Sequence, residues 1–227
     1  MSSSKADGER RLPIVVLLSG FGSNFAAIAA AAAAGTLPVE IRAVLSDRPA
    51  ARGLERARTL GIPAEAVAPA GYADRRAHDA ALMARIDAYA PALVVLAGYL
   101  RIFQPPFIAR YAGRLVNIHP SLLPEFRGLD THRRALEAGA AWHGCTVHFV
   151  SDELDGGPLI AQARVPIVAG DTPETLAERV HLREHVLYPR VLGWFAAGRL
   201  AERAGHAWLD GQPLERPVLI EDGDGSR

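Results

Sequence analysis

The feature that most constrains the fold of this chain is the alternation of short apolar runs with helix-forming segments in its first half. Aliphatic, partly β-branched runs predict buried strands at residues 14–18, 41–45, 93–97 and 115–118. Helices are predicted between them over residues 24–34, 54–60, 73–89 and 104–111. Strands with little polar alternation are buried on both faces, as in a parallel sheet covered by helices. The alternation therefore predicts an α/β fold with a doubly wound, mostly parallel, Rossmann-like sheet.

The second half of the chain has a different pattern. Helices are predicted over residues 131–138 and 175–197, and strands over residues 146–150 and 159–167. These strands predict a partly antiparallel C-terminal portion packed on the sheet. No linker or internal repeat separates the halves, so we expect a single domain over residues 12–220. Short disordered tails are expected at residues 1–11 and 221–227.

Charge and cysteine content exclude several classes of function. The 227 residues include 25 Lys and Arg and 25 Asp and Glu, so the net charge is zero. A balanced charge argues against a protein that coats nucleic acid or a membrane surface. No apolar stretch approaches the roughly 20 residues of a membrane span, and the polar start lacks a secretory signal core. The lone Cys145 excludes a disulfide framework and is expected to be a small buried hydrophobe, which predicts a reducing, cytoplasmic location.

No metal site is predicted. His181 and His185 are four residues apart on the last predicted helix, a spacing that places both on one face. A metal site needs further ligands, and no carboxylate or third histidine has supporting spacing. The histidine pair is therefore interpreted without a metal.

The first segment with chemical character is the turn after the first strand. It reads Ser19-Gly20-Phe21-Gly22-Ser23-Asn24. Two glycines allow backbone N–H groups to face an anion, and a helix N-terminus adds partial positive charge. Ser23 and Asn24 are favourable N-cap residues and also phosphate donors. The turn predicts phosphate binding, with a glycine turn that serves packing alone as the alternative.

Two further segments follow buried strands. Residues 97–103 bring apolar groups and Arg101 to the ligand edge of the sheet. They either hold a flat heteroaromatic ring or form part of the ordinary core.

Asn117 and His119 are two residues apart on a strand end, so their side chains share a face. A carboxamide donor beside an imidazole suits stabilisation of an oxyanion and movement of a proton.

An acidic turn over residues 152–158 completes the set. Asp152, Glu153 and Asp155 stand beside Gly156 and Gly157. The simplest interpretation is a solvated turn. In the functional interpretation one of these acids folds over the site and favours the imidazolium form of His119, because a nearby carboxylate stabilises it. The spacing does not choose among the three acids.

Together these segments resemble the phosphoribosylglycinamide formyltransferase family, folate-dependent enzymes of purine synthesis. The likeness covers about residues 13–209. It is carried by the segments 19–24, 96–102, Asn117-Ile118-His119-Pro120-Ser121-Leu122-Leu123-Pro124, and Asp152-Glu153-Leu154-Asp155-Gly156-Gly157. Phe21 departs from the pattern, because the family often has a polar residue there.

The resemblance implies a formyltransferase fold and a reaction. A formyl group passes from 10-formyltetrahydrofolate, as co-substrate, to the amine of 5'-phosphoribosylglycinamide, giving formylglycinamide ribonucleotide and tetrahydrofolate. The family pattern implies a catalytic trio of Asn117, His119 and Asp155, which selects Asp155 among the acids. No metal or nucleic acid is implied, and a homodimer is allowed.

The resemblance also implies two sets of binding residues. The N-terminal half supplies the phosphate site and the C-terminal half completes the folate site. Ribonucleotide contacts are implied for Gly22, Ser23, Asn24, His181, Leu182, Arg183 and Glu184. Folate contacts are implied for Arg75, Leu100, Arg101, Ile102, Phe103, Asn117, Ser151, Asp152, Glu153, Leu154 and Asp155. By its position alone, Arg75 would be a solvated helix residue.

Proteins with other functions share part of this pattern of residues. A formyltetrahydrofolate hydrolase would use water as acceptor, and its family carries an additional domain before the catalytic one. A methionyl-tRNA formyltransferase would need a further C-terminal domain and basic surface. An amino-sugar transformylase is a further alternative, although the phosphate turn favours the ribonucleotide. A nicotinamide-dependent oxidoreductase would use Gly20 and Gly22 with Asp47, but Phe25 replaces the third glycine. A non-catalytic folate- or nucleotide-binding module would leave Asn117 and His119 without a role.

Overall fold

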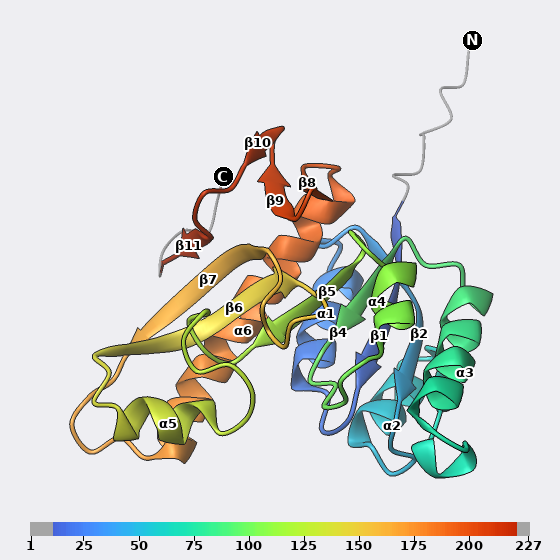
Figure 1. The fold of residues 1–227 in the computed structure, drawn as a ribbon, viewed down its shortest axis with the longest axis horizontal. Coiled ribbons are helices and arrows are strands. Elements are labelled where there is room, and N and C mark those ends of the chain that lie inside the picture. Colours follow the sequence, from blue (N-terminus) through green and yellow to red (C-terminus); the bar gives the residue numbers. More distant parts are fainter. Residues whose placement is uncertain (1–10, 222–227) are drawn as a thin grey trace.

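The computed structural model describes residues 11–221 and contains a main sheet of eight strands (Figure 1). The strand order is β11-β7-β6-β5-β4-β1-β2-β3. The strands are β1 (Leu12–Leu18), β2 (Val39–Ser46), β3 (Ala64–Ala66), β4 (Leu93–Leu96), β5 (Leu115–His119), β6 (Trp142–Phe149), β7 (Leu159–Pro166) and β11 (Val218–Ile220). The strands β1 to β5 pair in parallel, whereas β6 pairs antiparallel with both β5 and β7. The predicted α/β fold with an antiparallel C-terminal portion is confirmed.

Helices cover both faces of this sheet (Figure 1). They are α1 (Ser23–Ala33), α2 (Arg52–Thr59), α3 (Arg75–Ala88), α4 (Pro105–Arg110), α5 (Thr131–Glu137), α6 (Pro173–Ala196) and the 3-10 helix η1 (Pro69–Gly71). Phe25 of α1 and Leu187 of α6 share one buried cluster, and Leu82 of α3 and Phe107 of α4 share the other. Since β1, β4 and β5 are parallel neighbours, the loops after them meet at one edge, where ligands bind in such sheets.

Several short elements were not predicted. A small antiparallel sheet, in the order β10-β9-β8, consists of β8 (Leu200–Arg203), β9 (His206–Leu209) and β10 (Gln212–Pro213). These strands are too short to show a recognisable apolar run in the sequence. The same holds for the strands β3 and β11 and for the 3-10 helix η1. The strand β6 starts at Trp142, four residues before the predicted start at residue 146. The prediction missed these first residues because Gly144 interrupts the apolar pattern of the sequence. A Cβ at Gly144 would lie 2.0 Å from the Ala163 carbonyl oxygen, so close strand packing requires glycine there.

The ends of the chain extend beyond these elements. Disordered tails were expected at residues 1–11 and 221–227. Arg11 and Glu221 are the first and last residues that the structure describes, and the other residues of both tails lie outside the described range. Among residues 11–221 no helix is both long and apolar enough to cross a membrane.

Candidate active site

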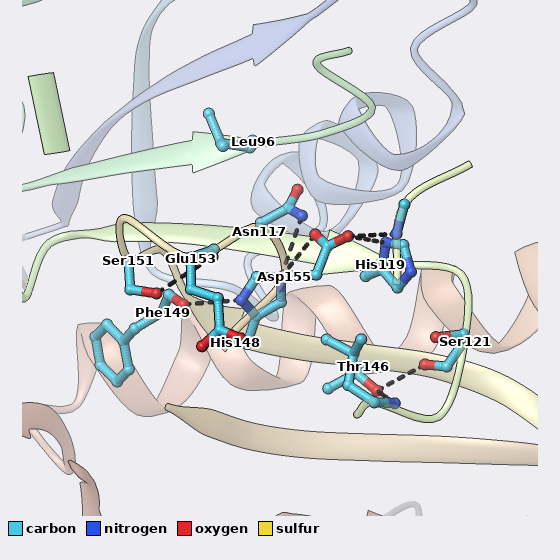
Figure 2. Close-up of polar contacts among 12 residues, drawn as sticks. Leu96, Asn117, His119, Ser121, Thr146, His148, Phe149, Ser151, Glu153 and Asp155 are labelled. Carbon is cyan, nitrogen blue, oxygen red and sulfur yellow. Dashed lines mark hydrogen bonds and ion pairs between the residues drawn. The ribbon is translucent and has the colours of Figure 1, made fainter. Parts of the chain in front are cut away.

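The strand β5 places Asn117 and His119 on one face at the ligand edge of the sheet (Figure 2). His119 is buried and its Nδ1 lies 3.4 Å from Oδ2 of Asp155. Its Nε2 lies 3.0 Å from the carbonyl oxygen of Phe126, which only accepts hydrogen bonds. Both ring nitrogens therefore face oxygen acceptors. This arrangement suits an imidazolium that donates from both nitrogens.

Asp155 reaches His119 from the loop after β6. The residue has a left-handed backbone with φ 49°, and the Gly128 N–H donates to Oδ2 over 2.9 Å. The neighbouring acids point elsewhere: Glu153 forms an ion pair with Arg127, and Asp152 is exposed. The structure thus brings Asp155, among the three acids of this loop, to the histidine.

His148 is a site residue that the sequence analysis missed. It lies opposite Asn117 in the antiparallel pairing of β5 and β6, and its Nε2 is 3.2 Å from Asn117 Nδ2. Burial lowers the pKa of His148 to about 4, so the ring is neutral at pH 7. Nδ1 lies 2.8 Å from the Phe149 carbonyl oxygen and must carry the proton. Nε2 therefore accepts from Asn117, which fixes the direction of the carboxamide and leaves its second N–H free for a ligand.

A pocket opens beside these groups with about 510 Å³ of empty space. It is lined by Leu96, Tyr99, Arg101, Ile102, Phe103, Ile108, Asn117, His148, Val150, Ser151, Asp152, Glu153, Leu154 and Asp155. Tyr99 and Phe103 stack with ring centroids 5.2 Å apart and add a flat apolar wall. The mixture of aromatic and polar groups fits a heteroaromatic ligand.

Two residues implied as folate contacts do not line this pocket. Leu100 is 58% exposed, and its N–H donates to Ser19 Oγ instead. Arg75 is the first residue of α3 and is exposed. The remaining implied folate residues all belong to the lining.

The phosphate turn joins β1 to α1. The predicted N-cap, Ser23 or Asn24, is wrong: the N-cap is Gly22, with φ 75° and no side-chain cap. A Cβ at Gly22 would lie 2.9 Å from the Gly53 Cα, so the turn approaches α2 too closely for a side chain. Ser23 then becomes the first residue of α1, and the first backbone N–H groups of this helix are not capped by a side chain.

Asn24 and Glu184 connect this turn to α6. Asn24 Nδ2 donates to Glu184 Oε2 over 2.8 Å. Glu184 is 3% exposed, and burial raises the pKa of its carboxyl group against the opposing effect of the Asn24 hydrogen bond. Asn24 Oδ1 is buried without a hydrogen-bond partner among the described residues, which marks it for a ligand donor.

The other residues of α6 that were predicted to contact the ribonucleotide lie in different surroundings. His181 and Leu182 are exposed, and the Arg183 guanidinium donates to the Ile220 carbonyl oxygen over 2.8 Å. Of this helical segment, Glu184 is the residue that contacts the phosphate turn. Cys145 is buried in β6, as predicted. Over residues 11–221 no group of three or more His, Cys, Asp or Glu side chains is arranged so that it could hold a metal ion.

Comparison with known proteins gives consistent matches. The family model described as formyl transferase matches residues 12–192. A phosphoribosylglycinamide formyltransferase of Escherichia coli strain K12 is 53% identical over 88% of this chain and 95% of that protein. One of Haemophilus influenzae is 42% identical over 89% of this chain and 96% of that protein. The solved phosphoribosylglycinamide formyltransferase of Coxiella burnetii matches with a TM-score of 0.90 and 50% identity, covering 93% of this chain and 100% of that chain.

Proposed function

Because the chain belongs to the phosphoribosylglycinamide formyltransferase family, we propose that its catalytic residues are Asn117, His119 and Asp155. The chain transfers a formyl group to phosphoribosylglycinamide in purine biosynthesis. One observation above all supports these three residues: the 3.4 Å approach of Asp155 Oδ2 to His119 Nδ1, beside a carboxamide on the same strand face.

The formyl donor is 10-formyltetrahydrofolate, bound in the pocket between β5 and residues 151–155. The flat wall of Tyr99 and Phe103 suits the pterin ring, with Arg101 and Ile102 beside it. Contacts by Leu100 and Arg75 rest on the family resemblance, because both lie outside the pocket lining.

The ribonucleotide phosphate binds at Gly22, Ser23 and Asn24, on the N-terminus of α1. The uncapped N–H groups and the helix dipole favour a dianion there. A ribose hydroxyl or the glycinamide amine is a suitable donor to the unpartnered Asn24 Oδ1. Glu184 orients Asn24, while contacts by His181, Leu182 and Arg183 rest on the resemblance.

The transfer proceeds by addition and elimination. The substrate amine attacks the formyl carbon, and a tetrahedral intermediate forms with a negative oxygen. The free N–H of Asn117 donates to this oxygen, and the imidazolium of His119 stabilises it electrostatically, since both of its N–H groups face other acceptors. Asp155 holds the charged ring and assists the proton transfer from the amine to the departing folate nitrogen.

The alternatives have weaker support. A formyltetrahydrofolate deformylase of Burkholderia mallei shares the fold with a TM-score of 0.79 at 27% identity, so the fold alone leaves the acceptor open. The higher identity to ribonucleotide transformylases favours phosphoribosylglycinamide over water, tRNA or an amino sugar. A dinucleotide site is disfavoured, because Phe25 fills the third glycine position and is fully buried.

A turnover assay tests the reaction. Purified protein is mixed with 10-formyltetrahydrofolate, with and without phosphoribosylglycinamide, and the deformylated folate is followed by absorbance. We expect folate turnover that requires the ribonucleotide. Turnover without it would identify a hydrolase. Absence of turnover in both mixtures would favour another acceptor or a binding module.

Gly22→Ala tests the phosphate turn. We expect about a tenfold increase of the KM for the ribonucleotide with little change of kcat, because a Cβ at φ 75° adds strain and displaces the turn from Gly53. Steady-state kinetics measures both constants. Gly71→Ala is the matched control, since a Cβ there meets nothing within 4 Å. An unchanged KM for the Gly22 variant would contradict phosphate binding at this turn.

The domain organisation, the cellular location and the partners of the chain are also proposals. Residues 12–220 act as one domain, since the main sheet draws strands from both halves of this range. The buried free thiol of Cys145 is compatible with a reducing cytoplasm. A homodimer is compatible with this assignment, and neither nucleic acid nor a membrane is an expected partner.

A further inference from the structure

Phe21 lies at the tip of the phosphate turn between two arginines of α2. Its side chain is 56% exposed, although it is aromatic. The guanidinium carbon of Arg52 lies 5.5 Å from the ring centroid, and that of Arg56 lies 5.1 Å from it. Both arginines are four residues apart on α2 and therefore share a helix face. We call Phe21, Arg52 and Arg56 the arginine rim.

The positive charges of the arginine rim are not neutralised. Within residues 11–221 neither Arg52 nor Arg56 forms an ion pair with a carboxylate, and Glu55 between them forms none either. Some other exposed arginines, such as Arg85 with Glu65, are paired with a carboxylate. A phenyl ring attracts a guanidinium and holds it in place without cancelling its charge.

The arginine rim is attached to the phosphate turn by the backbone. The Gly53 N–H, next to Arg52, donates to the Gly20 carbonyl oxygen over 3.0 Å. Gly22 approaches Gly53 so closely that a Cβ would lie 2.9 Å from its Cα. These contacts hold the start of α2, the helix that carries both arginines, against the phosphate turn.

We propose that Phe21, Arg52 and Arg56 form a second anion-binding surface that captures the phosphate dianion of the ribonucleotide and passes it to the phosphate turn. The proposal rests on the ribonucleotide site described above. Two cations close to an anion site raise the local concentration of a dianion and strengthen its binding at low ionic strength. Phe21 acts by holding both guanidinium groups toward the turn.

The test uses the full chain with Arg52→Gln and Arg56→Gln combined. The dissociation constant of phosphoribosylglycinamide, and the inhibition constant of inorganic phosphate, are measured at low and high ionic strength. We expect both constants to rise about tenfold at low ionic strength and to approach the wild-type values in about 0.5 M salt. The KM for the folate and the kcat at saturating ribonucleotide should not change.

Two further variants make the outcome specific. Arg203→Gln removes a charge from the small antiparallel sheet, where Arg203 lies over the Trp208 ring, and should leave both constants unchanged. Phe21→Leu keeps both charges and should cause a smaller loss of binding. Wild-type binding constants and salt dependence in the double variant would overturn the proposal. Failure of the wild-type chain to bind the ribonucleotide would instead overturn the ribonucleotide site itself.

Discussion

His119→Ala is expected to lower kcat by about 10²–10³-fold, which corresponds to about 3–4 kcal/mol of lost transition-state stabilisation. The imidazole lies at the end of β5 with Asp155 Oδ2 3.4 Å from Nδ1 and the Phe126 carbonyl oxygen 3.0 Å from Nε2. Alanine removes the cation that stabilises the oxyanion and leaves Asp155 without its partner. The folate turnover assay measures kcat, and the KM for the ribonucleotide should change little, because the phosphate turn is a separate element.

Two controls separate catalysis from folding in this experiment. His206→Ala makes the same substitution on an exposed histidine of β9 and should keep full activity. His119→Gln retains a polar side chain at the buried position without the charge. If the Gln variant folds with a wild-type melting temperature and loses activity like the Ala variant, the charge of the imidazole is the essential property. Full activity in either His119 variant would remove this residue from the mechanism.

The sequence predicts the strands that carry the site residues well, because local sequence patterns determine these strands. The apolar runs of β1, β4 and β5 fix a parallel sheet, and the two-residue spacing of Asn117 and His119 fixes a shared strand face. Small strands such as β8 and β3 lack such a pattern, since they are stabilised by tertiary pairing rather than by an apolar run.

The rest of the site depends on contacts between distant segments. Asp155 reaches His119 only because a left-handed backbone and the Gly128 N–H turn its carboxylate inward, which spacing does not reveal. His148 could have been found from the antiparallel pairing of β5 with β6, since it lies directly opposite Asn117. The N-cap prediction failed for a similar reason: the neighbouring Gly53, far along the chain, excludes a side chain at the cap position.

Asp155→Asn is expected to lower kcat by about 10²-fold or more, within the range typical of lost proton transfer and charge stabilisation. Asparagine preserves the size of the side chain but carries no negative charge beside Nδ1 of His119. The ring then has no negative charge beside Nδ1, and the proton transfer that Asp155 assists becomes slower. The folate turnover assay, with both substrates saturating, measures kcat.

Glu215→Gln provides the control for this prediction, since it neutralises an exposed acid between β10 and β11, outside the pocket lining and outside the loop of Asp155. It should leave the rate unchanged, because the field of an exposed charge is screened by water and salt. Binding of the ribonucleotide should be nearly unaffected in both variants, since Gly22 and Asn24 lie on the turn after β1 rather than in this loop. A wild-type rate in Asp155→Asn would mean that the proximity of Asp155 to His119 is structural. A slow variant that also has a lowered melting temperature would assign Asp155 to loop geometry through Gly128 rather than to the reaction itself.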